Sequence, residues 1–149
     1  MKIEIYSDGS SDGKSGGIGG WAFVIVIDGV KVYEKNGSEA GATNNSVEIR
    51  AAIEGLKYVD NYLTSQPTVG AVNREVILRS DSQLVLGYAT RRYQCKAMHL
   101  LPLYLELNKL FSKLGAKDSW VKGHSGNEFN EVCDKLAKSA RENTNPDPK

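Results

Sequence analysis

The chain has 149 residues, of which 25% are charged, and its formal net charge at pH 7 is +1. This length suits one domain with one buried core, and the near-neutral charge argues against a protein that coats nucleic acid without selectivity. The longest apolar run, residues 21–27, is too short to cross a bilayer. Two widely separated cysteines and the lack of a secretory leader pattern lead us to expect a soluble, cytoplasmic protein with no membrane partner.

The first forty residues predict an antiparallel three-stranded meander. Alternating apolar residues and β-branched residues favour strands over residues 2–7, 21–27 and 31–36. Asp28-Gly29 between the last two is a strong two-residue hairpin signal. The glycine-rich residues 12–20 predict a loop.

The rest of the chain alternates helical and strand patterns. Apolar residues at helical spacing predict one long helix, two further helices and a C-terminal helix, and two apolar runs predict strands. In chain order these segments are residues 43–63, strand 75–79, residues 82–88, residues 100–114, strand 118–122 and residues 129–140. The resulting order, βββ-α-β-α-α-β-α, predicts an α/β fold with a mixed sheet and helices on its faces.

The domain is expected to span residues 1–142, followed by a polar, proline-containing tail over 143–149 that we expect to be disordered. Cys133 falls on the apolar stripe of the last helix, which indicates a core position. Trp21 and Trp120 lie in strand patterns and are expected to pack.

Four acidic residues lie at the ends of predicted strands or in the first two turns of predicted helices. Asp8 and Asp81 each end an apolar strand, Glu48 lies near the start of the long helix, and Asp134 lies in the second turn of the last helix. Ligand sites of open α/β sheets gather at the carboxyl ends of strands. Carboxylates brought together there repel one another unless cations hold them, so the pattern predicts a site for Mg²⁺ or Mn²⁺.

Each of these residues also has an ordinary structural explanation. Asp8 could form a turn, Asp81 could cap a helix, and Glu48 could interact favourably with the helix dipole. Asp134 could be a solvated charge, and His124, between glycines, could be an exposed loop residue. These explanations predict no spatial relation among the five residues, whereas the topology brings them to one end of the sheet.

Taken together, the motifs resemble those of the type 1 ribonuclease H family over about residues 1–140. The resemblance depends on their order and spacing as well as on the residues themselves. The motifs are Asp8-Gly9-Ser10, Thr43-Asn44-Asn45 with Glu48, Ser80-Asp81-Ser82-Gln83, Val121-Lys122-Gly123-His124, and Asn130-Glu131 with Cys133-Asp134.

This resemblance implies a ribonuclease H-like fold with a five-stranded mixed sheet, and an endonuclease that hydrolyses the RNA strand of RNA–DNA hybrids with two Mg²⁺ ions. Mn²⁺ is a possible substitute, and the products would carry 5′-phosphate and 3′-hydroxyl ends. By position, Asp8 would bridge the two ions and Asp81 and Asp134 would complete the first and second metal shells. Glu48 would bind one ion and accept from a ribose 2′-OH, the group that distinguishes RNA from DNA. His124 would shuttle protons or assist product release.

The resemblance also assigns residues that contact the hybrid. Asn44, Asn45 and Gln83 would lie in its minor groove, and Thr43 would hold a phosphate of the DNA strand. Capping of the helix is an alternative role for Thr43 and Asn44, and the two roles are compatible. Gly9, Ser10 and Asn130 belong to the same motifs and are also expected at the substrate.

Three departures from the family pattern concern substrate binding. Residues 12–17 replace the family's usual loop, Gly41 stands where a basic residue is common, and the interval from Asp81 to His124 is too short for the full basic protrusion. Arg91, Arg92 and Lys96 are a partial substitute, or else a solvated loop. We therefore expect a monomer that binds the hybrid with modest affinity. An accessory nucleic-acid-binding partner could supply further contacts. A DNA-processing nuclease of the same fold and a catalytically inactive hybrid-binding module are the alternatives.

Overall fold

The computed structural model describes residues 1–12, 17–66, 73–123 and 126–143. Within these residues lie five strands and four α-helices, with a short 3₁₀ turn, η1, over Met98–Leu100. The strands are β1 (Lys2–Ser11), β2 (Ile18–Ile27), β3 (Val30–Ala40), β4 (Glu75–Ser80) and β5 (Lys117–Trp120). The helices are α1 (Asn44–Ser65), α3 (Gln83–Ala89), α4 (Leu101–Lys113) and α5 (Glu128–Asn143).

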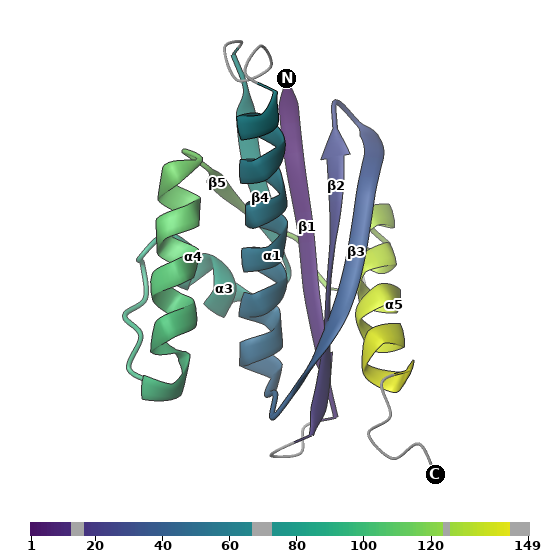
Figure 1. Cartoon of the computed structure of the whole chain (residues 1–149), viewed down its shortest axis with the longest axis vertical. Coiled ribbons are helices and arrows are strands. Elements are labelled where there is room, and N and C mark those ends of the chain that lie inside the picture. The colour runs from purple at the N-terminus through teal and green to yellow at the C-terminus, as the bar shows by residue number, and fades with distance from the viewer. Residues whose placement is uncertain (13–16, 67–72, 124–125, 144–149) are drawn as a thin grey trace.

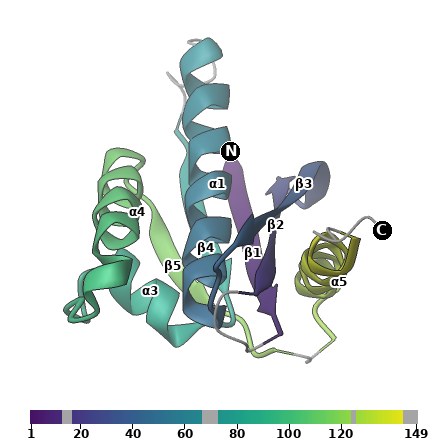
Figure 2. The same ribbon diagram turned by 60° about the horizontal axis from the view of Figure 1, so that its bottom comes forward.

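The strands form one mixed sheet in the order β3-β2-β1-β4-β5. β1, β2 and β3 pair antiparallel, and β4 pairs in parallel with β1 and β5. Helices α1, α3 and α4 lie on one side of the sheet and α5 lies on the other (Figures 1 and 2). The predicted α/β class, element order and five-stranded mixed sheet are confirmed.

The predicted hairpin turn between β2 and β3 is also confirmed. Asp28 and Gly29 both have positive φ, 50° and 85°, the backbone that a two-residue turn with matching twist requires. Asp28 ties this turn to the first strand, since its N–H donates to the Lys2 carbonyl and its carboxylate accepts from the Lys2 N–H, each at 2.9 Å.

Four of the predicted strands have wrong boundaries, and β3, predicted over residues 31–36, covers Val30–Ala40. β1 continues to Ser11, so Asp8 lies inside the strand and pairs with Ala22, although the parallel ladder with β4 stops at Ser7. β2 begins at Ile18, so the predicted loop is shorter than expected, and residues 13–16 lie outside the described residues. β5 covers Lys117–Trp120 instead of residues 118–122.

Gly20 shows why composition misled the prediction for β2. A Cβ at this residue would overlap the Ala137 carbonyl oxygen, and it would lie 2.7 Å from the Arg141 nitrogen. The glycine is therefore there to let the backbone of α5 approach the strand, and it does not indicate a loop.

Each face of the sheet covers its own cluster of buried side chains. The larger cluster lies under α1, α3 and α4, and includes Ile5, Ile53 and Leu107. The smaller cluster lies under α5 and consists of Tyr6, Val24, Val26, Val121 and Cys133, with Phe129, Val132 and Leu136 packed against it. The predicted core position of Cys133 is confirmed.

The C-terminal helix α5 ends at Asn143, one residue beyond the predicted domain boundary, and residues 144–149 lie outside the described residues. Within the part of the chain that the structure describes, no helix has both the length and the apolar character needed to cross a membrane.

Candidate active site

Three of the four predicted carboxylates meet at one end of the sheet. Asp8, Glu48 and Asp81 each offer an oxygen, and these oxygens all lie within 4.8 Å of one another. Parallel pairing of β1 with β4 ends at Ser7 and Ser80, so the next residues of both strands emerge side by side. Glu48 enters from the second turn of α1, which packs against β1.

Gly9 joins the carboxylates of β1 and α1. Its N–H donates to Asp8 Oδ1 at 2.9 Å and to Glu48 Oε1 at 3.1 Å. A Cβ on Gly9 would lie 2.7 Å from the Glu48 nitrogen and from the Val47 carbonyl carbon. Glycine is needed here because α1 can approach β1 closely enough to share this N–H only where no side chain intervenes.

Asp81 is positioned by the end of β5 and the residues that follow. The indole Nε1–H of Trp120 donates to the Asp81 carbonyl oxygen at 3.2 Å. A Cβ on Gly123 would lie 2.9 Å from Asp81 Oδ2, so the backbone there lies directly against the carboxylate. Trp120 is 51% exposed, and the prediction that it packs in the interior is therefore wrong.

The helix-cap explanation for Asp81 is also wrong. The N-cap of α3 is Ser82, whose Oγ accepts from the Val85 N–H at 3.1 Å. The Ser82 N–H in turn donates to Ser80 Oγ at 3.0 Å. Capping of α3 is thus provided by the neighbouring serines.

Burial and mutual repulsion raise the pKa values of the clustered carboxyl groups. The pKa of Asp8 rises from 3.8 to about 7, chiefly because the group is buried and next because of the charge on Asp81, while the Gly9 hydrogen bond partly offsets the rise. The pKa of Glu48 lies well above its usual value, first through burial and then through the charges of Asp8 and Asp81. A divalent cation would relieve this repulsion, and an all-carboxylate oxygen donor set suits Mg²⁺ or Mn²⁺.

Asp134 stands apart from this group of three. Among the described residues, the carboxylate oxygens that lie within 4.8 Å of one another do not include those of Asp134. Asp134 Oδ2 instead lies 3.3 Å from Lys138 Nζ. It is close enough, however, for its charge to contribute to the raised pKa of Asp8. His124, the fifth predicted catalytic residue, lies outside the described residues.

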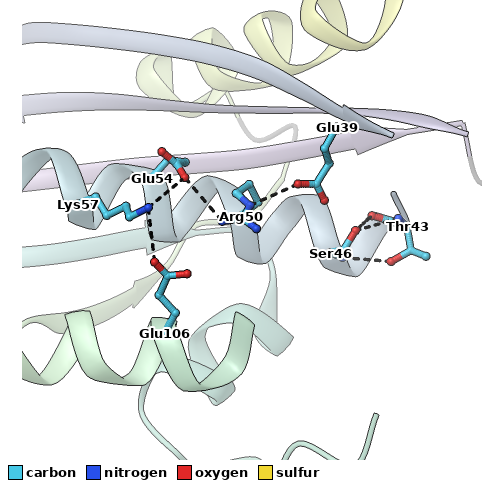
Figure 3. A network of polar contacts seen from close by, with 7 residues as sticks. All are labelled: Glu39, Thr43, Ser46, Arg50, Glu54, Lys57 and Glu106. Carbon is cyan, nitrogen blue, oxygen red and sulfur yellow. Dashed lines mark hydrogen bonds and ion pairs between the residues drawn. The ribbon is translucent and has the colours of Figure 1, made fainter. Parts of the chain in front are cut away.

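The predicted substrate residues at the start of α1 are exposed at the same end of the sheet. Thr43 is the N-cap: its Oγ1 accepts from the Ser46 N–H at 3.1 Å, and its own N–H donates to Ser46 Oγ at 2.9 Å (Figure 3). Asn44 Oδ1 accepts from the Ser11 hydroxyl at 2.7 Å, and Asn45 is exposed. The capping role of Thr43 is confirmed, and a phosphate contact stays a prediction.

The other predicted contacts differ in exposure. Gln83 is the exposed first residue of α3, two residues after Asp81, and Ser10 is partly exposed on β1. Asn130 is only 4% exposed, and its N–H donates to Asn127 Oδ1 at 3.0 Å at the start of α5.

The basic residues after α3 are partly engaged within the fold. Arg91, which has a positive φ of 65°, donates from Nε to Asn108 Oδ1 at 3.0 Å. Arg92 Nη1 lies 3.0 Å from Asp118 Oδ2, and Lys96 is exposed. Gly41, which stands where a basic residue is common in the family, has a φ of 69°.

A charged network runs along the outer side of α1 (Figure 3). Arg50 lies 3.3 Å from Glu39 of β3 and 3.7 Å from Glu54, and Lys57 reaches Glu106 of α4 at 3.5 Å. This network links α1 to both neighbouring elements, so the helix that carries Glu48 is held in place on both sides.

Sequence reasoning missed the positioning roles of Trp120, Gly123 and Lys138. The spacing of Asp134 and Lys138, four residues apart on a helix, was a usable signal for an ion pair. No sequence pattern indicated the contact of Trp120 with Asp81, because it joins residues 39 positions apart.

Comparisons with known proteins agree with this geometry. The family model described as RNase H matches residues 1–142. Ribonuclease H of Treponema denticola is 33% identical, covering 94% of this chain and 97% of that protein, and ribonuclease H of Caldanaerobacter subterraneus subsp. tengcongensis is 37% identical, covering 91% and 88%. Among solved structures, RNase H1 of Halobacterium salinarum has a TM-score of 0.79 at 25% identity, covering 97% of this chain and all of that one. The LC11-RNase H1 complex with an RNA/DNA hybrid, at 23% identity and a TM-score of 0.77 over 94% and 96%, shares the fold. The chain belongs to the ribonuclease H family.

Proposed function

We propose that the chain is an endonuclease that hydrolyses the RNA strand of RNA–DNA hybrids and leaves 5′-phosphate and 3′-hydroxyl ends. The observation that carries this proposal is the convergence of Asp8, Glu48 and Asp81 within 4.8 Å in a chain of the ribonuclease H family. A related structure of the same fold is a complex with an RNA/DNA hybrid, which supports the substrate class.

The carboxylates suit two divalent cations. Asp8, Glu48 and Asp81 would hold one ion, and Asp134 would complete a second site that shares Asp8. Two such ions supply an activated water and stabilise the leaving oxygen in phosphodiester hydrolysis. The raised pKa values of Asp8 and Glu48 support a cation site, because buried carboxyl groups of this kind lose their protons most readily when a cation replaces the proton.

The hybrid would lie across the exposed starts of α1 and α3. Thr43, Asn44 and Asn45 at the start of α1 and Gln83 at the start of α3 are exposed there, and the backbone N–H groups of a helix start favour phosphate. Glu48 would accept from the ribose 2′-OH, which restricts cleavage to the RNA strand. His124 would move protons on and off the reacting oxygens. The protein would act as a monomer, and an accessory partner could add the phosphate contacts that Gly41 does not provide.

One assay tests the proposal directly. The protein is incubated with Mg²⁺ and with labelled RNA–DNA, RNA–RNA, DNA–DNA or single-stranded RNA, with Asp8→Asn as the inactive control. We expect cleavage of the RNA strand of the hybrid alone, with products that a 5′-phosphate-dependent exonuclease degrades. Cleavage of DNA duplexes would favour a DNA-processing nuclease, and binding of the hybrid without cleavage would indicate an inactive module.

A further inference from the structure

Lys138 of α5 pairs with Asp134, the predicted carboxylate that does not belong to the group of Asp8, Glu48 and Asp81. Its Nζ lies 3.3 Å from Asp134 Oδ2, and the two side chains are 50% and 20% exposed. Side chains on a helix lean toward its N-terminus, so a lysine four residues after an aspartate is in the favourable orientation for this contact.

Asp134 and Lys138 lie on the part of α5 that packs beside the end of β1. α5 runs beside β1 in the same direction, because the Cys133 thiol contacts the Tyr6 carbonyl oxygen at 3.2 Å and Arg141 Nη1 contacts the Ser11 carbonyl oxygen at 3.0 Å. Asp8 lies between these two contacts along β1, as Asp134 and Lys138 lie between them along α5. Lys138 therefore places a positive charge on Asp134, the carboxylate of α5 whose own charge reaches Asp8.

We propose that Lys138 competes with the second divalent ion for Asp134 and so sets the concentration at which that ion binds. This inference rests on the proposed function, in which Asp134 ligates the second ion. An ion that binds there must displace the ammonium from Oδ2 or bind against its charge. Because the pair is partly exposed, the competition is modest, and removing it should tighten binding of the second ion about two- to fivefold.

The direct test measures Mn²⁺ binding to the free protein, by calorimetry and by electron paramagnetic resonance of the unbound ion. Lys138→Gln keeps most of the side-chain length and removes the charge. Lys135→Gln is the matched control, since Lys135 is an exposed lysine on the same helix that lies about 60° farther from Asp134 around the helix axis than Lys138 does. We expect Lys138→Gln to shift the weaker binding phase about two- to fivefold toward lower Mn²⁺, and Lys135→Gln to match the wild type.

A double-mutant cycle shows whether the effect acts through Asp134. In an Asp134→Asn background, Lys138→Gln should produce no further shift in Mn²⁺ binding. The Mg²⁺ concentration that half-saturates hybrid cleavage by Lys138→Gln should fall by the same factor as the binding constant.

Three results would overturn the inference. The first is a superposition of the Mn²⁺ curves of the wild type and Lys138→Gln up to about 20 mM, and the second is an equal shift in the Asp134→Asn background. The third is an unchanged Mn²⁺ curve with weaker hybrid binding, which would assign Lys138 to the substrate. Failure of the proposed function is a separate result, since a protein that cleaves no hybrid still gives a measurable Mn²⁺ curve.

Discussion

Replacing Asp8 by asparagine should stabilise the metal-free protein at alkaline pH while abolishing hydrolysis. The asparagine keeps the shape of the side chain and can still accept from the Gly9 N–H that now donates to Asp8 Oδ1. It removes, however, one of three carboxylates that lie within 4.8 Å of one another. The free energy of unfolding should therefore rise wherever Asp8 is ionised, because the folded state no longer carries the buried charge.

The pH window follows from the direction of the pKa shift. Asp8 has a pKa of about 7 in the folded state, against an ordinary value of 3.8. Between these values the folded protein holds a proton that the unfolded chain has lost, so the stability of the metal-free wild type falls as pH rises through about 4 to 7. Above that window both states are ionised, and the whole penalty is present.

The size of the effect can be bounded. The difference between 3.8 and about 7 is about three pKa units, and at about 1.4 kcal/mol each this gives an upper limit of about 4 kcal/mol at pH 8. A buried amide NH₂ without a full set of partners costs about 1–3 kcal/mol, which offsets part of the gain. We therefore expect the variant to be more stable than the wild type by about 1–2 kcal/mol at pH 8.

Urea denaturation in a chelating buffer, at several pH values between 4.5 and 8.5, measures this difference. The stability curve of the variant should be flatter over the window, and Mg²⁺ should reverse the order of stabilities by binding the wild type alone. Asp118→Asn is the control, because it removes a carboxylate that lies outside the group of three and is paired with Arg92. A variant less stable than the wild type at pH 8 without metal would refute the repulsion argument.

Four further outcomes are expected. The Mg²⁺ concentration for half-maximal hydrolysis should fall as pH rises from 6 to 8, because protons leave the carboxyl group with the pKa near 7 and stop competing with the cation; titrations at fixed ionic strength check this. Trp120→Phe should raise that concentration about tenfold with little change in melting temperature, since it frees the Asp81 carbonyl; a lower melting temperature with an unchanged Mg²⁺ requirement would contradict it. Arg92→Ala should reduce the slope of log hybrid affinity against log salt by up to about 0.9. Arg91→Ala should instead cost about 1 kcal/mol in urea, because Arg91 holds Asn108.

The secondary structure was predictable because each element carries its own local pattern. The long apolar stripe of α1, the short apolar strand β4 and the Asp28-Gly29 turn are each specified by residues within their own segment. The end of β1 was not, since the strand continues past its parallel partner only because β2 still pairs with it. Gly20 misled for a similar reason, because its purpose becomes clear only when α5 lies against it.

At the site, too, features specified within one segment were predictable, and those set by contacts between distant segments were not. Asp8, Glu48 and Asp81 were predictable as neighbours because the elements that carry them meet at one end of the sheet. The separation of Asp134 from them was not, since no local pattern indicates how far α5 holds this carboxylate from the other three. Trp120 was predicted to pack because it lies in a strand pattern, whereas it is exposed and its indole N–H donates to the Asp81 carbonyl oxygen.

The unequal clusters on the two faces of the sheet have a consequence for folding. β1, α1 and β4 share the larger cluster, whereas α5 adds only the smaller one from the far end of the chain. Opening of the α5 face breaks fewer buried apolar contacts than opening of the face under α1, so α5 should detach from the sheet more readily than α1 does. That opened molecule keeps Asp8, Glu48 and Asp81 in place and loses only Asp134. In the proposed two-ion site, the second ion should therefore slow amide hydrogen exchange in α5, while the first ion should slow it in β1, α1 and β4.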